Sequence, residues 1–247
     1  MPITGDNQPK RNGRVLLISG IYCTIPANSS TSSQGIVEIV SQNVSQIISV
    51  AQLRELYRAP NSFVQAKVKP TLDPVSTKFI QHCPFLLIAT RDELGRVDVS
   101  PRGGPAGFVN AREDGTIAIP DLNGNNLLDT LENIVATGRV ATLFLQPGQD
   151  ETLRVNGTAI VTTDSAVLDA FTTELRRPKS AIVIQPDEVF IHCAKAFRRG
   201  GVWQPDSWST DGPDGIDILR CQFDIPGDEA TLRASFAEGY VADLAQD

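Results

Sequence analysis

The middle of the chain repeats a pattern of short apolar runs separated by turn-forming residues. The clearest run is Phe85-Leu86-Leu87-Ile88-Ala89-Thr90, which predicts a buried strand. A turn follows at Asp92-Glu93-Leu94-Gly95, and Asp114-Gly115 is a hairpin signal. The same pattern predicts strands over residues 96–100, 116–120, 140–145, 152–162, 180–184 and 188–193, with another beginning at Phe108.

At least six of these strands are joined mainly by tight turns, and one helix is inserted among them. This order predicts a mostly β (α+β) fold, an antiparallel barrel with peripheral helices. The phosphate-binding loops G-x-G-x-x-G and G-x-x-x-x-G-K-[ST] are both missing from the sequence. A Rossmann fold or a P-loop fold therefore has no support.

The inserted helix is predicted from apolar residues at the spacing of one helical face: Leu127, Leu128, Leu131, Ile134 and Val135. Asn126 is the expected N-cap, and Gly138 the expected stop. Further helical patterns cover residues 36–58, 164–171, 195–199 and 229–244. Residues 1–35 have the composition of an irregular tail.

We expect three parts: an N-terminal extension over 1–50, the barrel domain over 51–208 and a C-terminal extension over 209–247.

The net charge of −7 makes nucleic acid an unexpected partner. No apolar run approaches the length of a membrane helix, so we expect a cytoplasmic protein. The dispersed cysteines and two histidines favour reduced thiols over a metal site.

The segment from Ile117 to Ile134 is the strongest candidate for a binding site. A strand ends at Pro120, and a loop containing Asp121, Asn123, Gly124, Asn125 and Asn126 leads into the helix. Free backbone N–H groups and the positive end of a helix dipole favour a phosphate group at such a place. The alternative is a capped helix that follows a turn and binds nothing.

Three other places combine polar or aromatic groups. Ser100 and Arg102 leave a strand together, and a guanidinium binds phosphate as a planar fork. Arg154 lies on the polar face of a strand, and Lys195 precedes Trp203 in a basic and aromatic segment. Each also has a purely structural interpretation, as an exposed arginine or a packed C-terminal segment.

Four runs taken together resemble the pyridoxamine 5'-phosphate oxidase-related FMN-binding proteins. They are FIQHCPFLLIATRDELGRVDVSPRGGPAGFV, IAIPDLNGNNLLDTLENI, ETLRVNGTAIVTTD and VFIHCAKAFRRGGVW, in that order. The nearest likeness is to an uncharacterised subgroup with S-P-R-G and I-P-D-x-x-G-N-N motifs. The resemblance covers residues 53–208 and implies a six-stranded split barrel, a homodimer and FMN bound at the dimer interface.

The resemblance also implies roles for individual residues. Ser100, Arg102, Asn125 and Asn126 would hold the FMN phosphate. The isoalloxazine ring would lie beside Ile119, Pro120 and Asp121, with Arg154 and Lys195 approaching from the neighbouring subunit and Trp203 close to the ring. Two departures leave the substrate open: the Arg-x-His of the oxidases is missing, and their Ser-Arg-Lys phosphate cluster is replaced by Gly-Asn-Asn.

The function implied is an FMN-dependent oxidoreductase that acts on an unknown small molecule, with no catalytic residue assigned. A flavin-binding module without turnover, such as a carrier or sensor, is one alternative. A split barrel that uses deazaflavin or haem is another, although the scarcity of histidine argues against haem. A structural dimer with an empty site is the fourth.

Overall fold

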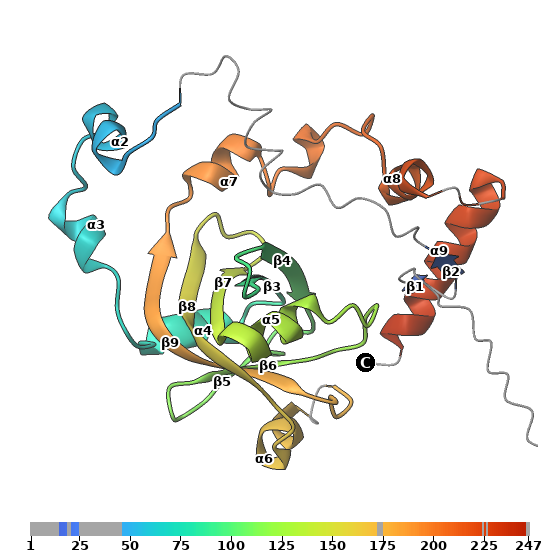
Figure 1. Ribbon diagram of the computed structural model, residues 1–247, viewed down its shortest axis with the longest axis horizontal. Coiled ribbons are helices and arrows are strands. Elements are labelled where there is room, and N and C mark those ends of the chain that lie inside the picture. The colour runs from blue at the N-terminus through green and yellow to red at the C-terminus, as the bar shows by residue number, and fades with distance from the viewer. Residues whose placement is uncertain are drawn as a thin grey trace, which may run out of the picture. The chain divides into compact units, whose positions relative to one another are not determined.

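The computed structural model describes residues 15–18, 21–24, 46–171, 175–223, 225 and 227–245 (Figure 1). The chain divides into two compact units, residues 1–61 and 62–247. In the first unit β1 (Val15–Ile18) pairs antiparallel with β2 (Ile21–Thr24). The prediction of an irregular tail is therefore wrong for this hairpin.

The helix predicted over residues 36–58 is much shorter in the described part of the chain. There α2 (Val50–Leu56) begins after Ser49, whose side chain accepts a hydrogen bond from the backbone N–H of Gln52. Residues 36–45 of the predicted helix lie outside the described residues. The helix begins after Ser49 because the serine hydroxyl satisfies a backbone N–H group of the first turn, which a preceding helical turn would otherwise bind.

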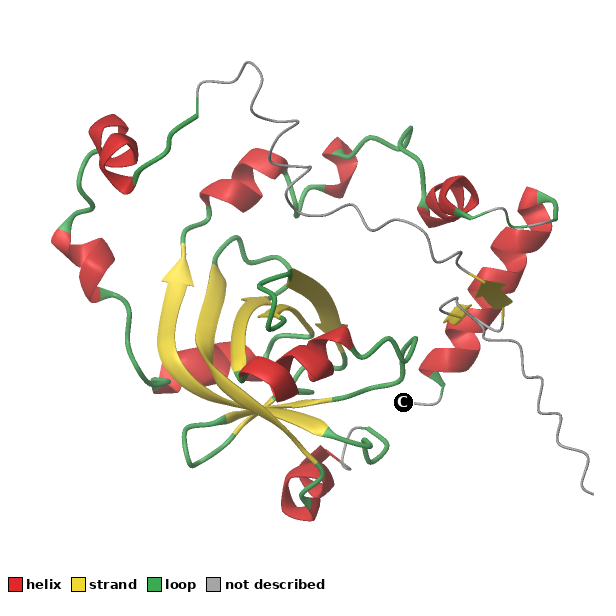
Figure 2. Ribbon diagram, viewed as in Figure 1, coloured by secondary structure: helices red, strands yellow, loops and turns green. Residues whose placement is uncertain are grey.

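The second unit is built on one curled antiparallel sheet, which Figure 2 shows as an open half-barrel. Its strands are β3 (Phe85–Arg91), β4 (Val97–Gly103), β5 (Asn110–Ala111), β6 (Ile117–Pro120), β7 (Arg139–Leu145), β8 (Thr152–Thr162) and β9 (Ala181–His192). Their order across the sheet is β4-β3-β7-β8-β9-β6-β5. The predicted split barrel is confirmed, with seven strands instead of six because the two-residue β5 pairs with β6.

Alternation along the strands separates an inner face from an outer face. On β3 the side chains of Leu86 and Ile88 are fully buried, whereas Leu87 between them is only partly buried. The inner face forms one apolar core that includes Phe144, Val155 and residues of every strand from β3 to β9 except β4. Each such buried side chain contributes about 1.5–3 kcal/mol relative to an exposed one.

The predicted strands 180–184 and 188–193 are one continuous strand, β9. Pro186 lies opposite Gly157 of β8, and the pairing register shifts there, which leaves Asp187 as the extra residue of a bulge. A proline inside a central strand is tolerated at a bulge because the ladder hydrogen bond is already interrupted. The sequence pattern predicted a break where the structure has this bulge.

Short helices surround the sheet. They are α3 (Ser62–Ala66), α4 (Pro74–Gln81), α5 (Asp129–Thr137), α6 (Ser165–Leu168) and the 3-10 turn η1 (Asp169–Phe171). The helix α5 contacts β3, β4, β7 and β8, and its Ile134 is buried in the core. Asp164 caps α6, since its carboxylate accepts from the N–H groups of Ala166 and Val167.

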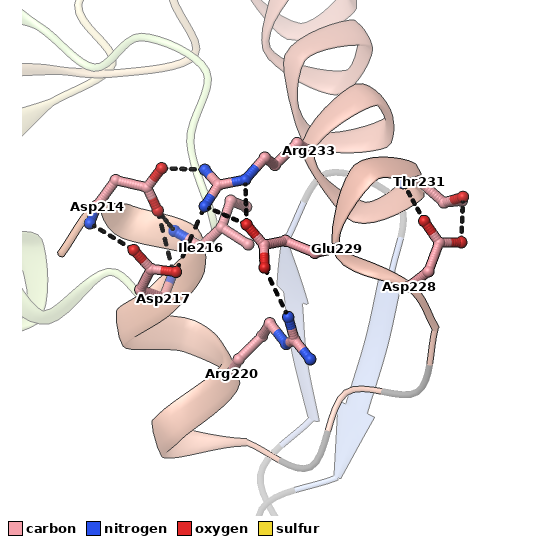
Figure 3. A network of polar contacts seen from close by, with 8 residues as sticks. All are labelled: Asp214, Ile216, Asp217, Arg220, Asp228, Glu229, Thr231 and Arg233. Carbon is pink, nitrogen blue, oxygen red and sulfur yellow. Dashed lines mark hydrogen bonds and ion pairs between the residues drawn. The ribbon is translucent and has the colours of Figure 1, made fainter.

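The C-terminal part contains α7 (Lys195–Gly200), the 3-10 turn η2 (Pro205–Ser207), α8 (Gly215–Gln222) and α9 (Glu229–Leu244). The bounds predicted for the last helix are confirmed. Arg233 of α9 forms ion pairs with Asp214 and Asp217 at the start of α8 and with Glu229 on its own helix (Figure 3). This charged network joins the two helices.

Candidate functional site

Six of the predicted binding residues meet at a small cavity where β4, the β6–α5 loop and the start of α5 come together. We call this cavity, of about 160 Å³, the loop cleft. It is lined by Asp98, Ser100, Arg102, Asp121, Leu122, Gly124, Asn125, Asn126, Leu127, Leu128, Asp129, Thr130 and Leu131. Alternation along β4 turns Asp98, Ser100 and Arg102 to the same face of the sheet, toward α5.

A hydrogen-bonded cluster forms one wall of the loop cleft. The Ser100 hydroxyl donates to a carboxylate oxygen of Asp98 at 3.1 Å. The hydroxyl of Thr130 in the first turn of α5 lies 3.1 Å from the Ser100 oxygen and 3.3 Å from the same Asp98 oxygen. Thr130 is buried, so this cluster fixes the start of α5 against β4.

The start of α5 differs from the sequence prediction. Asn126 is not the N-cap: the helix begins at Asp129, and Asn126 and Leu128 both have left-handed backbones with φ of 57° and 61°. The Asn125 side chain accepts from the N–H of Leu127 at 3.0 Å, which closes a local turn in place of a cap. Among the residues that the structure describes, no side chain caps α5, so its first N–H groups lie at the loop cleft without a side-chain acceptor from them.

A second, larger cavity of about 420 Å³ adjoins the loop cleft, and we call it the cation cavity. It shares Asp121, Leu122, Gly124, Asn126, Leu128 and Leu131 with the loop cleft and adds Asn123, Arg176, Arg177, Pro178, Lys179 and Ser180. The Asp121 N–H donates to the Ser180 carbonyl at 2.9 Å, which continues the pairing of β6 with β9. This pairing brings residues 176–180 beside the loop.

Asp121 lies between the two cavities and is half-buried. Burial raises the pKa of its carboxyl group, while the charges of Arg102 and Lys179 act in the opposite direction. The ionisation of Asp121 therefore depends both on its burial and on the charges of Arg102 in the loop cleft and Lys179 in the cation cavity.

Ile119 and Pro120 were predicted to lie beside a flavin ring. The Ile119 side chain is fully buried in the core, and Pro120 is buried opposite Ala181 of β9. Neither residue lines the loop cleft. Their place in the fold is to end β6 so that Asp121 and the following loop reach the cavity.

The remaining predicted residues lie away from the loop cleft. Arg154 is on the outer face of the sheet, where its guanidinium lies 5.5 Å from the centre of the Phe190 ring. Lys195 is exposed on α7, and the Trp203 indole donates to the Gln149 carbonyl at 2.7 Å. None of these three side chains lines either cavity.

His192 shares the outer face with Arg154 and Phe190. Its ring lies 5.1 Å from that of Phe190, and its Nε2 is buried without a hydrogen-bond partner. Burial lowers the pKa of His192, and the nearby charges of Arg154 and Lys67 lower it further. The outer face therefore carries a second group of polar and aromatic side chains, separate from the loop cleft.

Several polar cavity residues were missed by the sequence prediction, among them Asp98, Thr130, Arg176 and Lys179. The run Arg176-Arg177-Pro178-Lys179 is a visible basic cluster in the sequence. No local sequence pattern links this basic cluster to residues 121–126. The two segments come together only through the pairing of β6 with β9. Asp98 and Thr130 carry no sequence signal, since a single Asp or Thr is common on strands and at helix starts.

Within the described part of the chain, no group of three or more His, Cys, Asp or Glu residues is placed to hold a metal ion. No helix in these same ranges is long and apolar enough to cross a membrane.

Residues 72–193 match the family model described as pyridoxamine 5'-phosphate oxidase. This segment belongs to that family. It contains the whole sheet and both cavities, so the family predicted from the four sequence runs is confirmed. Membership of the subgroup with S-P-R-G and I-P-D-x-x-G-N-N motifs stays a prediction.

Solved structures similar to this chain have low sequence identity. HupZ of Group A Streptococcus is 19% identical, with 49% of this chain and 93% of that chain covered and a TM-score of 0.41. A pyridoxamine 5'-phosphate oxidase-like protein of Lactobacillus delbrueckii is 20% identical, with 49% and 95% covered and a TM-score of 0.40. The FAD binding protein from Mycobacterium smegmatis is 12% identical, with 50% and 97% covered and a TM-score of 0.36. No curated protein matches this chain.

Proposed function

We propose that this protein binds FMN and is an oxidoreductase that acts on a small molecule. The observation that carries the proposal is that six of the residues predicted to bind the cofactor line one cavity inside the family segment: Ser100, Arg102, Asp121, Gly124, Asn125 and Asn126. These residues come from two separate stretches of sequence, β4 and the loop after β6, and a shared ligand explains why they converge.

The chemistry of this cavity fits a flavin nucleotide. The uncapped start of α5 offers backbone N–H donors, and Asn125 and Asn126 are exposed beside it. Gly124 has open space where a Cβ would be, so a ligand can approach its backbone closely. When bound, FMN supplies the hydride chemistry, and the residues of the chain bind and orient it and exclude water.

A homodimer with FMN at its interface is part of the same proposal. Support comes from the outer face of the sheet, where Phe85, Val97 and Val99 are exposed on neighbouring strands. Arg154 is on this outer face, whereas Ser100 and Arg102 are on the opposite face. Arg154 would therefore serve the flavin of a partner subunit, and the same applies to Lys195 and Trp203.

The first test is the visible spectrum of the freshly purified protein, with the released ligand identified by mass. The proposal expects a flavin spectrum and a released mass equal to FMN. FAD, a deazaflavin or haem in its place would overturn the choice of cofactor. A colourless protein that also ignores added FMN would overturn flavin binding altogether.

A second measurement separates an enzyme from a flavin carrier or sensor. The bound flavin is reduced under anaerobic conditions with NADH or NADPH, and its reoxidation is followed with candidate substrates. Reoxidation that depends on the substrate supports an oxidoreductase. A flavin that neither coenzyme reduces, and that no substrate reoxidises after chemical reduction, supports the non-catalytic module instead.

A further inference from the structure

We propose that Arg176 and Lys179 bind the phosphate of the cofactor, so that the phosphate lies in the cation cavity and not beside Ser100. The identity of the ligand rests on the proposed function, but the anion site is inferred from the charges of the two cavities alone. Neither residue belongs to the motifs that predicted the cofactor site.

The two adjoining cavities differ sharply in charge. The loop cleft is lined by three carboxylates, those of Asp98, Asp121 and Asp129, against the single guanidinium of Arg102. The cation cavity is lined by Arg176, Arg177 and Lys179 against the carboxyl group of Asp121 alone. A phosphate dianion is repelled by the first arrangement and attracted by the second.

The hydroxyl of Ser100 is also committed elsewhere. It donates its hydrogen to the Asp98 carboxylate at 3.1 Å, and Thr130 lies against the same pair. To donate to a phosphate, Ser100 would have to abandon this bond and leave the carboxylate with one donor fewer. The cluster therefore acts as a wall of the loop cleft and supplies no free donor to an anion.

Among the three cations of the larger cavity, Arg177 already has partners. Its guanidinium donates to Asp169 at 2.6 Å and to Ser165 at 3.2 Å. In the described part of the chain, no hydrogen bond or ion pair involves Arg176 or Lys179, and both are exposed at the cavity. The charge of Lys179 already acts on Asp121 across the cavity. Two unpaired cations match the two charges of a phosphate.

The backbone holds these cations in place beside the loop. The hydrogen bond from the Asp121 N–H to the Ser180 carbonyl joins the segment to the loop, and Pro178 is buried. Asn123, Gly124 and Asn126 line the same cavity. A phosphate there would have guanidinium and ammonium donors together with the polar groups of the loop.

This arrangement also accounts for the Gly-Asn-Asn sequence of the loop. Gly124, Asn125 and Asn126 carry no positive charge. The cations come instead from the segment before β9, which is distant in sequence but adjacent through the pairing of β6 with β9. Two positive charges are thus supplied from another element of the same fold.

The test compares FMN with riboflavin, which has the same ring system but no phosphate. Kd values for both are measured by titration with the wild type, the double variant Arg176→Gln/Lys179→Gln and the control Arg96→Gln. Arg96 is exposed and pairs with Asp92 in the β3–β4 turn, away from both cavities. For the double variant we expect FMN binding to weaken about 10-fold to 100-fold, with riboflavin binding unchanged. The control should match the wild type.

Equal weakening of FMN and riboflavin would mean a general structural effect, and unchanged FMN binding would mean that the phosphate lies elsewhere; either result overturns the inference. Inorganic phosphate, followed by the amide NMR shifts of residues 121–126 and 176–180, separates it from the proposed function. If the wild type binds no flavin but its phosphate shifts vanish in the double variant, the anion site stands and the flavin proposal fails. If neither phosphate nor flavin binds, both fail.

Discussion

At the scale of single residues, Gly157 has the least room for change. A Cβ built on Gly157 would lie 2.1 Å from the carbonyl oxygen of Gln185, which is a backbone atom that cannot rotate away. The contact occurs at the bulge where β8 meets Pro186 of β9, at the centre of the sheet. The glycine is therefore required by the close approach of two backbones.

Gly157→Ala should lower the free energy of unfolding by about 1–3 kcal/mol, because the two strands must separate locally to admit the methyl group. The measurement is urea unfolding followed by circular dichroism. Gly212→Ala is the matched control, since nothing lies within 4 Å of its Cβ position, and it should change stability by less than about 0.5 kcal/mol. Equal stability of the two variants would contradict the prediction.

Asp121 gives a pH dependence with a definite sign. Burial raises its folded pKa above the ordinary value of 3.8. The protonated carboxyl group is therefore favoured by folding, and this stabilisation is complete below pH 3.8 and is lost as the pH rises through the folded pKa. Relative to Asp121→Asn, the wild type should become less stable as the pH is raised from 3.5 to 7, measured by thermal unfolding without ligand.

Asp114→Asn is the control with the opposite sign. Hydrogen bonds from the Thr116 hydroxyl and N–H hold the pKa of Asp114 below its ordinary value. The stabilisation by ionised Asp114 is present above pH 3.8 and is lost as the pH falls. The stability of the wild type relative to Asp114→Asn should therefore increase as the pH rises. Parallel slopes for the two variants would contradict the assignment.

Sequence reasoning identified the loop residues but not the charges around them. Asn123 to Asn126 were found because turn residues before a helix are a local signal. Arg176 and Lys179 were missed, since their approach to this loop depends on strand pairing that no local pattern encodes. Arg154 was identified as polar, but its place on the other face of the sheet follows only from the register of four strands.

At the scale of elements, strands were predicted better than helix starts. β3, β7 and β8 follow alternation closely because burial of one face sets their register. The predicted start of α5 was wrong because Asn126 and Leu128 take left-handed conformations, so that the helix begins only at Asp129. A leucine with positive φ is rare, and nothing in a hydrophobic pattern indicates it.

The α8–α9 pair combines exposed charges with apolar residues: α8 buries no residue, whereas α9 buries Leu232 and Phe236. Hydrogen bonds from Arg233 to Asp214 and Glu229 raise the pKa of its guanidinium, so it stays charged at any ordinary pH. Asp214 also caps α8 by accepting from the N–H groups of Ile216 and Asp217 (Figure 3). Arg233, in the first turns of α9, therefore supports Asp214, the N-cap residue of α8.

Arg233→Gln should speed amide hydrogen exchange in α8 and in the first turn of α9, while exchange in β3 and β7 stays unchanged. Arg220→Gln is the control, because Arg220 makes a single ion pair, to Glu229 at 3.2 Å, and should have a smaller effect. In high salt the wild type should approach the Arg233 variant, since exposed ion pairs are screened. Identical exchange in both variants would contradict this role.

At the scale of the whole molecule, the part of the outer face formed by the edge strand β4 exposes apolar side chains to water. Val97 and Val99 on the edge strand β4 are 81% and 60% exposed, and Phe85 is exposed on the same face at the other end of β3, opposite Gly103. An edge strand with exposed apolar residues normally pairs with or packs against another chain. The proposed dimer would cover this face and bring Arg154 toward the loop cleft of its partner.

Val99→Glu tests the dimer and the flavin site together. A carboxylate at the centre of an apolar interface is costly to desolvate, so we expect the variant to elute as a monomer by light scattering and to lose FMN in parallel. Val135→Glu, at a 76% exposed position on α5, should remain dimeric and retain FMN. A Val99 variant that is monomeric but keeps FMN would place the whole flavin site within one subunit. One that stays dimeric would show that the subunits meet through another face.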